Sequence, residues 1–134
     1  MGGAAGTYGD HSRQYLWLIN TYRLDSEVVL KSCSWGKFQI MGESCSVCGV
    51  PNIDDFVEQM CTNEAKQLQL LADFIRNKKN RLNKKSPWAT LLWNAVKDKD
   101  WPNIANYYNG PNYAQYEYDK KLENAYLKLK GEQK

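Results

Sequence analysis

One stretch, Ser34–Gly42 with the sequence SWGKFQIMG, interrupts a chain that is otherwise patterned for helices. Two glycines bracket an alternation of apolar and polar residues, which is typical of a short extended segment. Because strand side chains alternate between faces, Phe38 and Ile40 would point one way and Gln39 the other. The alternative is a buried turn between helices, and the spacing alone leaves both structures open.

Around this stretch, apolar residues recur at intervals of three and four, the spacing of helices with one buried face. Several helix N-termini are marked by residues that favour helix starts. These are the capping residues Asp25, Asn52 and Asp100 and the pair Ser86-Pro87. Asn109-Gly110-Pro111 marks an end, because a left-handed glycine and a proline stop a helix. The helices are expected to begin near residues 15, 25, 52, 63, 86, 100 and 118.

Each longer helix has a set of residues that we expect to face the core. These are Tyr15, Leu18, Ile19 and Tyr22; Ile53, Phe56, Val57, Met60 and Cys61; Leu68, Leu71, Ala72 and Ile75; Trp88, Leu91, Leu92 and Ala95; Ile104, Ala105 and Tyr108; and Tyr118, Leu122, Ala125 and Leu129.

The length of 134 residues suits one domain. Residues 1–14 are rich in glycine and polar residues and are expected to be a flexible lead-in, with the folded domain over residues 15–130. The sequence predicts a mainly α domain of six or seven helices with at most a short extended element.

Four cysteines, Cys33, Cys45, Cys48 and Cys61, include one Cys-x-x-Cys pair. A zinc site made of four thiolates is conceivable, but the other two cysteines do not form a second such pair. We expect free thiols, no metal and no cofactor.

The net charge of +3 is too small to indicate nucleic-acid binding, but it suits an anionic cell-wall polymer. The basic segment 76–85 is either a solvated loop or a contact for such a polymer. The first residues lack the pattern of a signal peptide, and no stretch is apolar enough to insert into a membrane. We expect a protein made in the cytoplasm that needs a holin or a secretion system to reach the cell wall.

Ser34–Gly42 resembles the Ser-x-Gly-Leu-x-Gln-Ile-Met element that lysozyme-like transglycosylases and goose-type lysozymes place along the floor of their glycan cleft. Together with Tyr108-Asn109-Gly110-Pro111, it makes the chain similar, from about residue 15 to 127, to the C-terminal part of the phage-type N-acetylmuramidase family of endolysins. Further matching residues include Leu24, Asp25, Gly49, Asp55, Phe56, Glu64, Gln67, Trp101, Tyr113, Tyr118 and Tyr126.

The resemblance implies a lysozyme-like fold and cleavage of peptidoglycan glycan strands. It implies that Gln39, Tyr108 and Asn109 line the cleft and that Trp35, Met41 and Tyr113 form its walls. Two structural alternatives stay open, namely that Trp35 belongs to the core and that Asn109 only ends a helix. A non-catalytic or degenerate peptidoglycan-binding module is the alternative function.

The general acid of this family is a glutamate upstream of the Ser-Trp-Gly element, whereas residues 1–14 contain only Asp10 as an acid. We therefore expect the acid to lie before this chain. Two substitutes exist within it: Glu27, nine positions before Gly36 (36 minus 27), and Glu43, directly after Gly42.

Glu27 is the better substitute, because it precedes Val28, Val29 and Leu30 and could be shielded against Trp35 or Phe38. Glu43 begins a polar loop in which water would surround it. The sequence thus predicts that any residual muramidase activity is lost in Glu27→Gln and kept in Glu43→Gln.

Overall fold

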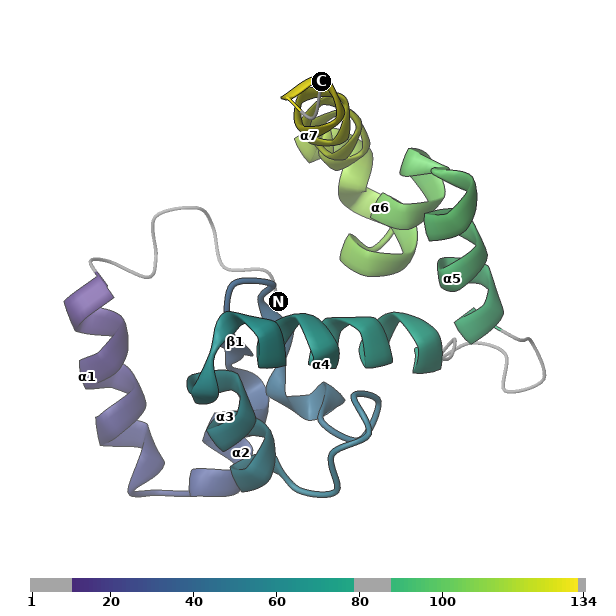
Figure 1. The fold of residues 1–134 in the computed structure, drawn as a ribbon. Helices are drawn as coiled ribbons and strands as arrows, with labels where there is room; N and C mark the ends of the chain where they lie inside the picture. Colours follow the sequence, from purple (N-terminus) through teal and green to yellow (C-terminus); the bar gives the residue numbers. More distant parts are fainter. Residues whose placement is uncertain (1–10, 79–87, 133–134) are drawn as a thin grey trace. The chain divides into compact units, whose positions relative to one another are not determined.

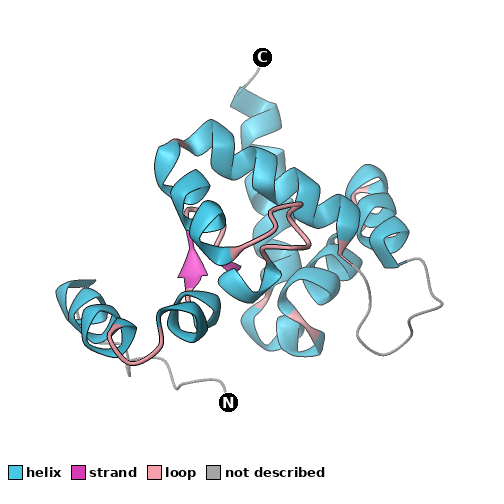
Figure 2. Ribbon diagram, turned by 90° about the horizontal axis from the view of Figure 1, so that it is seen from below, coloured by secondary structure: helices cyan, strands magenta, loops and turns pink. Residues whose placement is uncertain are grey.

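The computed structural model describes residues 11–78 and 88–132, which hold seven α-helices, two short 3-10 helices and one two-stranded antiparallel sheet (Figures 1 and 2). The prediction of a mainly α fold with a short extended element is confirmed. The chain divides into two compact units, Met1–Phe74 and Ile75–Lys134. No helix in the described ranges is long and apolar enough to cross a lipid bilayer.

The first unit contains the sheet and the helices up to Phe74, which lies within the last of these helices. Its elements are α1 (His11–Tyr22), α2 (Ser26–Ser32), β1 (Ser34–Trp35), β2 (Ile40–Met41), η1 (Gly42–Ser44), α3 (Ile53–Thr62) and α4 (Glu64–Asn77), which continues past Phe74. The caps act as the sequence predicts, because Asp25 Oδ1 accepts from Val28 N at 3.0 Å and Asn52 Oδ1 accepts from Asp55 N at 2.8 Å.

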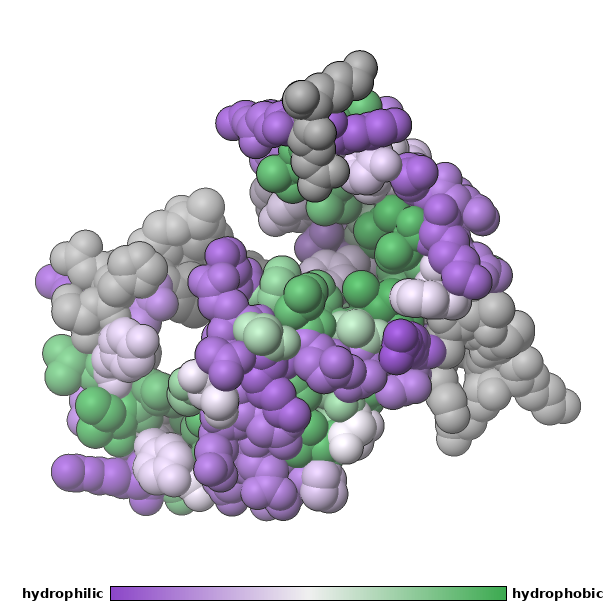
Figure 3. Space-filling view, viewed as in Figure 1, coloured by the Kyte–Doolittle hydropathy of each residue, from purple (hydrophilic) through white to green (hydrophobic). Residues whose placement is uncertain are grey.

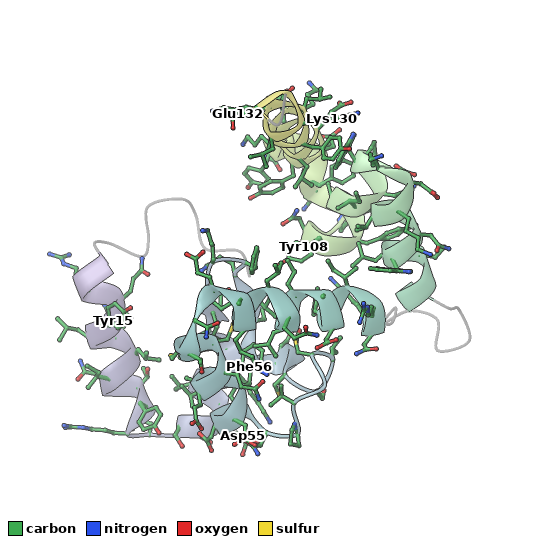
Figure 4. The ribbon with its side chains drawn as sticks, viewed as in Figure 1. Tyr15, Asp55, Phe56, Tyr108, Lys130 and Glu132 are labelled. Carbon is green, nitrogen blue, oxygen red and sulfur yellow. The ribbon has the colours of Figure 1, made fainter. Side chains whose placement is uncertain are left out.

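The core of this unit lies between α2, the sheet, α3 and α4. Phe56 of α3 is wholly buried, while its neighbour Asp55 is exposed at the start of the helix (Figure 4). The other buried side chains are Leu30, Ile40, Cys45, Cys48, Val50, Ile53, Met60, Leu70 and Phe74. Cys61, predicted to face inward, is exposed.

Helix α4 buries a different face from the one that the sequence predicts. Leu70 and Phe74 are buried, Leu68 is exposed, and Leu71, Ala72 and Ile75 are only partly buried. Gln67 lies on the same face as Leu70 and Phe74, and its side chain bonds to Met60 O of α3 and to Lys37 N in the turn between the strands.

Helix α1 forms, but its predicted buried face is wrong. The helix begins at His11, inside the stretch 1–14 predicted as a lead-in, and packs against α2. Tyr15, Ile19 and Tyr22 are exposed, and only Leu18 is partly buried. With Leu16 and Trp17 they make an apolar surface along α1, visible as the green and pale side chains at the left of Figure 3.

The second unit consists of α5 (Trp88–Asp98), α6 (Trp101–Asn109), η2 (Pro111–Tyr116) and α7 (Tyr118–Glu132) after the end of α4. Asp100 caps α6 through a bond from Asn103 N to its Oδ1 at 3.2 Å. The helix ends as predicted, at Gly110 with φ of +93° followed by Pro111. The Ser86-Pro87 start and residues 79–85 of the basic segment lie outside the described residues.

Burial in the second unit is concentrated in α5 and α6. Leu92, Ala95 and Ala105 are buried, as the sequence predicts. Of the other residues predicted to face inward, Ile104 and Tyr108 are partly buried. The exposed ones are Leu91, Tyr118, Leu122, Ala125 and Leu129. The side chain of Trp88 lies outside the described residues. Helix α7 instead turns Tyr126 toward α6, where its ring lies 5.3 Å from that of Trp101.

Gly42, at the end of β2, tests how tightly the sheet is seated on α2. A Cβ added there would lie 2.2 Å from the backbone oxygen of Leu30, so Gly42→Ala requires backbone movement. We expect Gly42→Ala to lower the free energy of unfolding by about 3 kcal/mol, the upper range for forcing extra atoms into a packed site. Urea denaturation followed by circular dichroism measures this.

Gly131→Ala is the matched control, because nothing lies within 4 Å of the methyl group that it adds. That variant should be as stable as the wild type or up to about 1 kcal/mol more stable, since alanine favours helix over glycine. Equal stability of Gly42→Ala and the wild type would contradict the close approach.

Candidate functional site

The segment Ser34–Met41 is a hairpin and not one continuous strand. Ser34 is opposite Met41 and Trp35 is opposite Ile40, with a turn between them. The predicted alternation is therefore wrong across the turn, where Gln39 has a φ of +53°. It holds after the turn, because Ile40 is buried and Met41 is exposed.

Gln39 lies at the end of the turn with its side chain exposed. Its Nε2 donates to the carbonyl oxygen of Gly36 at 2.9 Å, and its backbone N–H donates to the same oxygen at 3.3 Å. The backbone bond closes the turn, and the Nε2 bond orients the side-chain amide. No described residue donates to the Gln39 Oε1, so the turn presents a fixed acceptor to solvent.

Trp35 and Met41 flank this turn on the two strands. Trp35 is half-buried, and its Nε1 donates to the carbonyl oxygen of Leu30 at 2.9 Å. Met41 is exposed, and its Sδ accepts from Ser34 Oγ at 3.1 Å. Trp35 therefore anchors the hairpin to α2 while part of its ring stays accessible, so its role as a wall remains a prediction.

Gln67 is the residue that sequence reasoning missed as part of this site. Its Nε2 donates to the carbonyl oxygen of Met60 at 2.7 Å, and its Oε1 accepts from the backbone N–H of Lys37 at 2.9 Å. Lys37 Nζ also lies 3.2 Å from the carboxylate of Glu64. The sequence position of Gln67 could have indicated this contact. Gln67 lies one helical turn before Leu70, and a polar side chain on a buried helix face needs a hydrogen-bond partner.

Neither candidate acid is shielded. Glu27 lies on α2 with 66% of its side chain exposed and accepts from Lys31 Nζ, four residues later. The hydrogen bond from Lys31 to Glu27, and then the negative charge of Glu27, raise the pKa of Lys31. Glu43 lies in η1 and is also exposed. The shielding against Trp35 or Phe38 that the sequence suggested for Glu27 does not occur.

The remaining predicted contacts lie together in the second unit. Tyr108 and Asn109 form the last turn of α6, and Tyr113 follows in η2; Asn109 is exposed, and both tyrosines are half-buried (Figure 4 labels Tyr108). Lys78 Nζ donates to the carbonyl oxygen of Tyr107 at 2.6 Å and lies 5.7 Å from the centre of the Tyr108 ring. A cation is favourable there, because helix C-termini carry unpaired carbonyl groups.

The cysteines are free thiols in different surroundings: Cys45 and Cys48 are buried, Cys33 is half-buried and Cys61 is exposed. Burial raises the pKa of Cys33. Burial, and then the charges of Cys45 and Asp73, raise the pKa of Cys48 to about 12. Across residues 11–78 and 88–132, no group of three or more His, Cys, Asp or Glu side chains could hold a metal ion.

These surroundings predict which thiols react. Only the thiolate is nucleophilic, and a thiol with a pKa near 12 is ionised at pH 8 in about one molecule in ten thousand. With iodoacetamide at pH 8, we expect rapid labelling of Cys61 and very slow labelling of Cys48 in the native protein, measured by peptide mass spectrometry. In guanidinium chloride both should label rapidly, and equal native rates would contradict the burial of Cys48.

The helical fold with one short two-stranded hairpin is that of a lysozyme-like domain. The family model of N-acetylmuramidase matches residues 3–130, and the chain belongs to this family. Comparison with curated proteins finds no match.

Among solved structures, the chain is similar to the crystal structure of the Burkholderia AP3 phage endolysin. The two share 33% sequence identity and superpose with a TM-score of 0.72 over 90% of this chain. The chain spans 42% of the length of that endolysin.

Proposed function

We propose that this chain is the glycan-binding part of a peptidoglycan N-acetylmuramidase that acts on the cell wall. The observation that carries the proposal is the family match over residues 3–130. The fixed acceptor at Gln39 supports it, because a sugar hydroxyl or N-acetyl N–H needs an oriented acceptor to bind in one register. The similarity to a phage endolysin supports action on the cell wall, and we propose that a holin or a secretion system delivers the protein there.

Within this proposal, the six predicted binding residues act as two groups. Gln39 accepts a hydrogen bond from the glycan, and the accessible parts of Trp35 and Met41 pack against the apolar faces of the sugar rings. Tyr108, Asn109 and Tyr113 form a separate group within the second unit, and we propose that they contact the glycan as well.

The general acid has to come from elsewhere. A lysozyme-like acid must hold its proton until it protonates the leaving oxygen, and it does so in apolar surroundings. No charged residue in the described ranges is buried, and both Glu27 and Glu43 are exposed. We infer that the acid lies outside residues 11–78 and 88–132 of this chain.

Binding can be tested by pull-down on purified insoluble peptidoglycan. We expect the intact chain to bind and Gln39→Ala to bind about fivefold more weakly, the effect of losing about one hydrogen bond. Tyr108→Phe tests the second group while keeping the ring beside Lys78, and it should weaken binding by a similar factor.

Gln69→Ala is the control, because this exposed glutamine of α4 bonds only to Asp73 in the described part of the chain. It should bind as the wild type does. No binding by the intact chain, or binding that neither Gln39→Ala nor Tyr108→Phe changes, would remove the proposal.

The position of the acid is tested separately, by clarification of Gram-negative cells stripped of their outer membrane. Without a shielded carboxyl group, we expect the chain to clarify cells far more slowly than the Burkholderia AP3 phage endolysin. Glu27→Gln and Glu43→Gln should leave any residual rate unchanged. A rate comparable with the endolysin that Glu27→Gln abolishes would identify Glu27 as the acid, as the sequence suggested.

A further inference from the structure

We propose that Gln67 is a positioning residue that holds the hairpin turn so that Gln39 Oε1 is offered to the glycan. The inference rests on the proposed function, because it assigns Gln67 a part in the same binding site. Gln67 itself is half-buried in α4 and acts through the turn, without touching the glycan.

The first support is that both ends of the Gln67 amide are used. Nε2 can only donate and is bonded to Met60 O at 2.7 Å; Oε1 can only accept and is bonded to Lys37 N at 2.9 Å. The bond to α3 therefore fixes which way the amide faces. The Oε1 atom of Gln67 is thereby directed at the backbone N–H of Lys37 and holds the turn at that residue.

The second support is the close packing of the turn on the same side chain. A Cβ added at Gly36, whose φ is +69°, would lie 2.9 Å from Gln67 Oε1. The carbonyl oxygen of Gly36 in turn accepts both bonds that fix Gln39. Gln67 thus holds residues 36 and 37, and Gly36 holds Gln39.

An ion pair between α4 and the turn is too weak to replace this contact. Lys37 and Glu64 form an ion pair whose side chains are 62% and 76% exposed. Exposed pairs of this kind contribute little, because water and salt screen them and two long side chains must be ordered. Without Gln67 the turn would keep its own two bonds but lose its directed attachment to the helices.

The test is a double-mutant cycle on peptidoglycan binding. Gln67→Met keeps the length of the side chain and removes both hydrogen bonds. We expect it to weaken binding by about the same factor as Gln39→Ala, about fivefold. Because Gln67 acts through Gln39, adding Gln67→Met to Gln39→Ala should weaken binding no further, whereas independent contributions would multiply to about 25-fold.

Gln69→Met is the matched control on the same helix, and it should bind as the wild type does. In ¹H–¹⁵N spectra, Gln67→Met should shift the side-chain amide signals of Gln39 and speed hydrogen exchange at the Lys37 amide, whereas Gln69→Met should change neither. If Gln67→Met does not fold, Gln67→Leu takes its place, because it also removes both hydrogen bonds while keeping an apolar side chain at this half-buried position.

Wild-type binding by the Gln67 variants beside weakened binding by Gln39→Ala would overturn the inference and leave the proposed function standing. Additive losses in the double variant would also overturn it. No binding by the wild type would overturn the proposed function and this inference with it.

Discussion

Both ends of the hairpin converge on one backbone oxygen, that of Leu30. This carbonyl lies in the last turn of α2 and also accepts from the backbone N–H of Cys33 at 3.4 Å. Trp35 Nε1 bonds to it from one strand, and Gly42 passes so close at the end of the other strand that no side chain fits between them. The attachment of the hairpin to α2 therefore depends on Gly42, which has no Cβ, at one end and on the indole N–H of Trp35 at the other. The turn that presents Gln39 lies between the two strands that are attached in this way.

The elements that the sequence predicts well are those that local chemistry decides. Asp25, Asn52 and Asp100 cap helices because their own side chains reach an N–H group three residues later. The hairpin turn is different, because the left-handed backbone at Gln39 is unusual for a residue other than glycine. Its partners include Gln67, about thirty residues away, and no local pattern indicates such a contact.

Helical periodicity indicates an apolar face but does not say what that face packs against. In α1, Tyr15, Ile19 and Tyr22 follow the pattern of a buried stripe and are exposed. In α4 the polar Gln67 lies on the buried face beside Leu70 and Phe74, and its half-buried amide finds both a donor and an acceptor there. The site residues share this limit: the resemblance implied a role for Gln39 in the cleft, whereas Gln67 was only one of the matching residues and had no role assigned.

Binding and proton transfer make opposite demands on a side chain. A neutral amide such as Gln39 can remain in water and still be specific, because the Gly36 carbonyl fixes its orientation. A general acid must be removed from water and cations to keep its proton, whereas Glu27 is exposed and bonded to Lys31. The described part of the chain meets the first demand and not the second. In the proposed function, the hairpin holds the glycan and a carboxyl group in a more apolar environment supplies the proton.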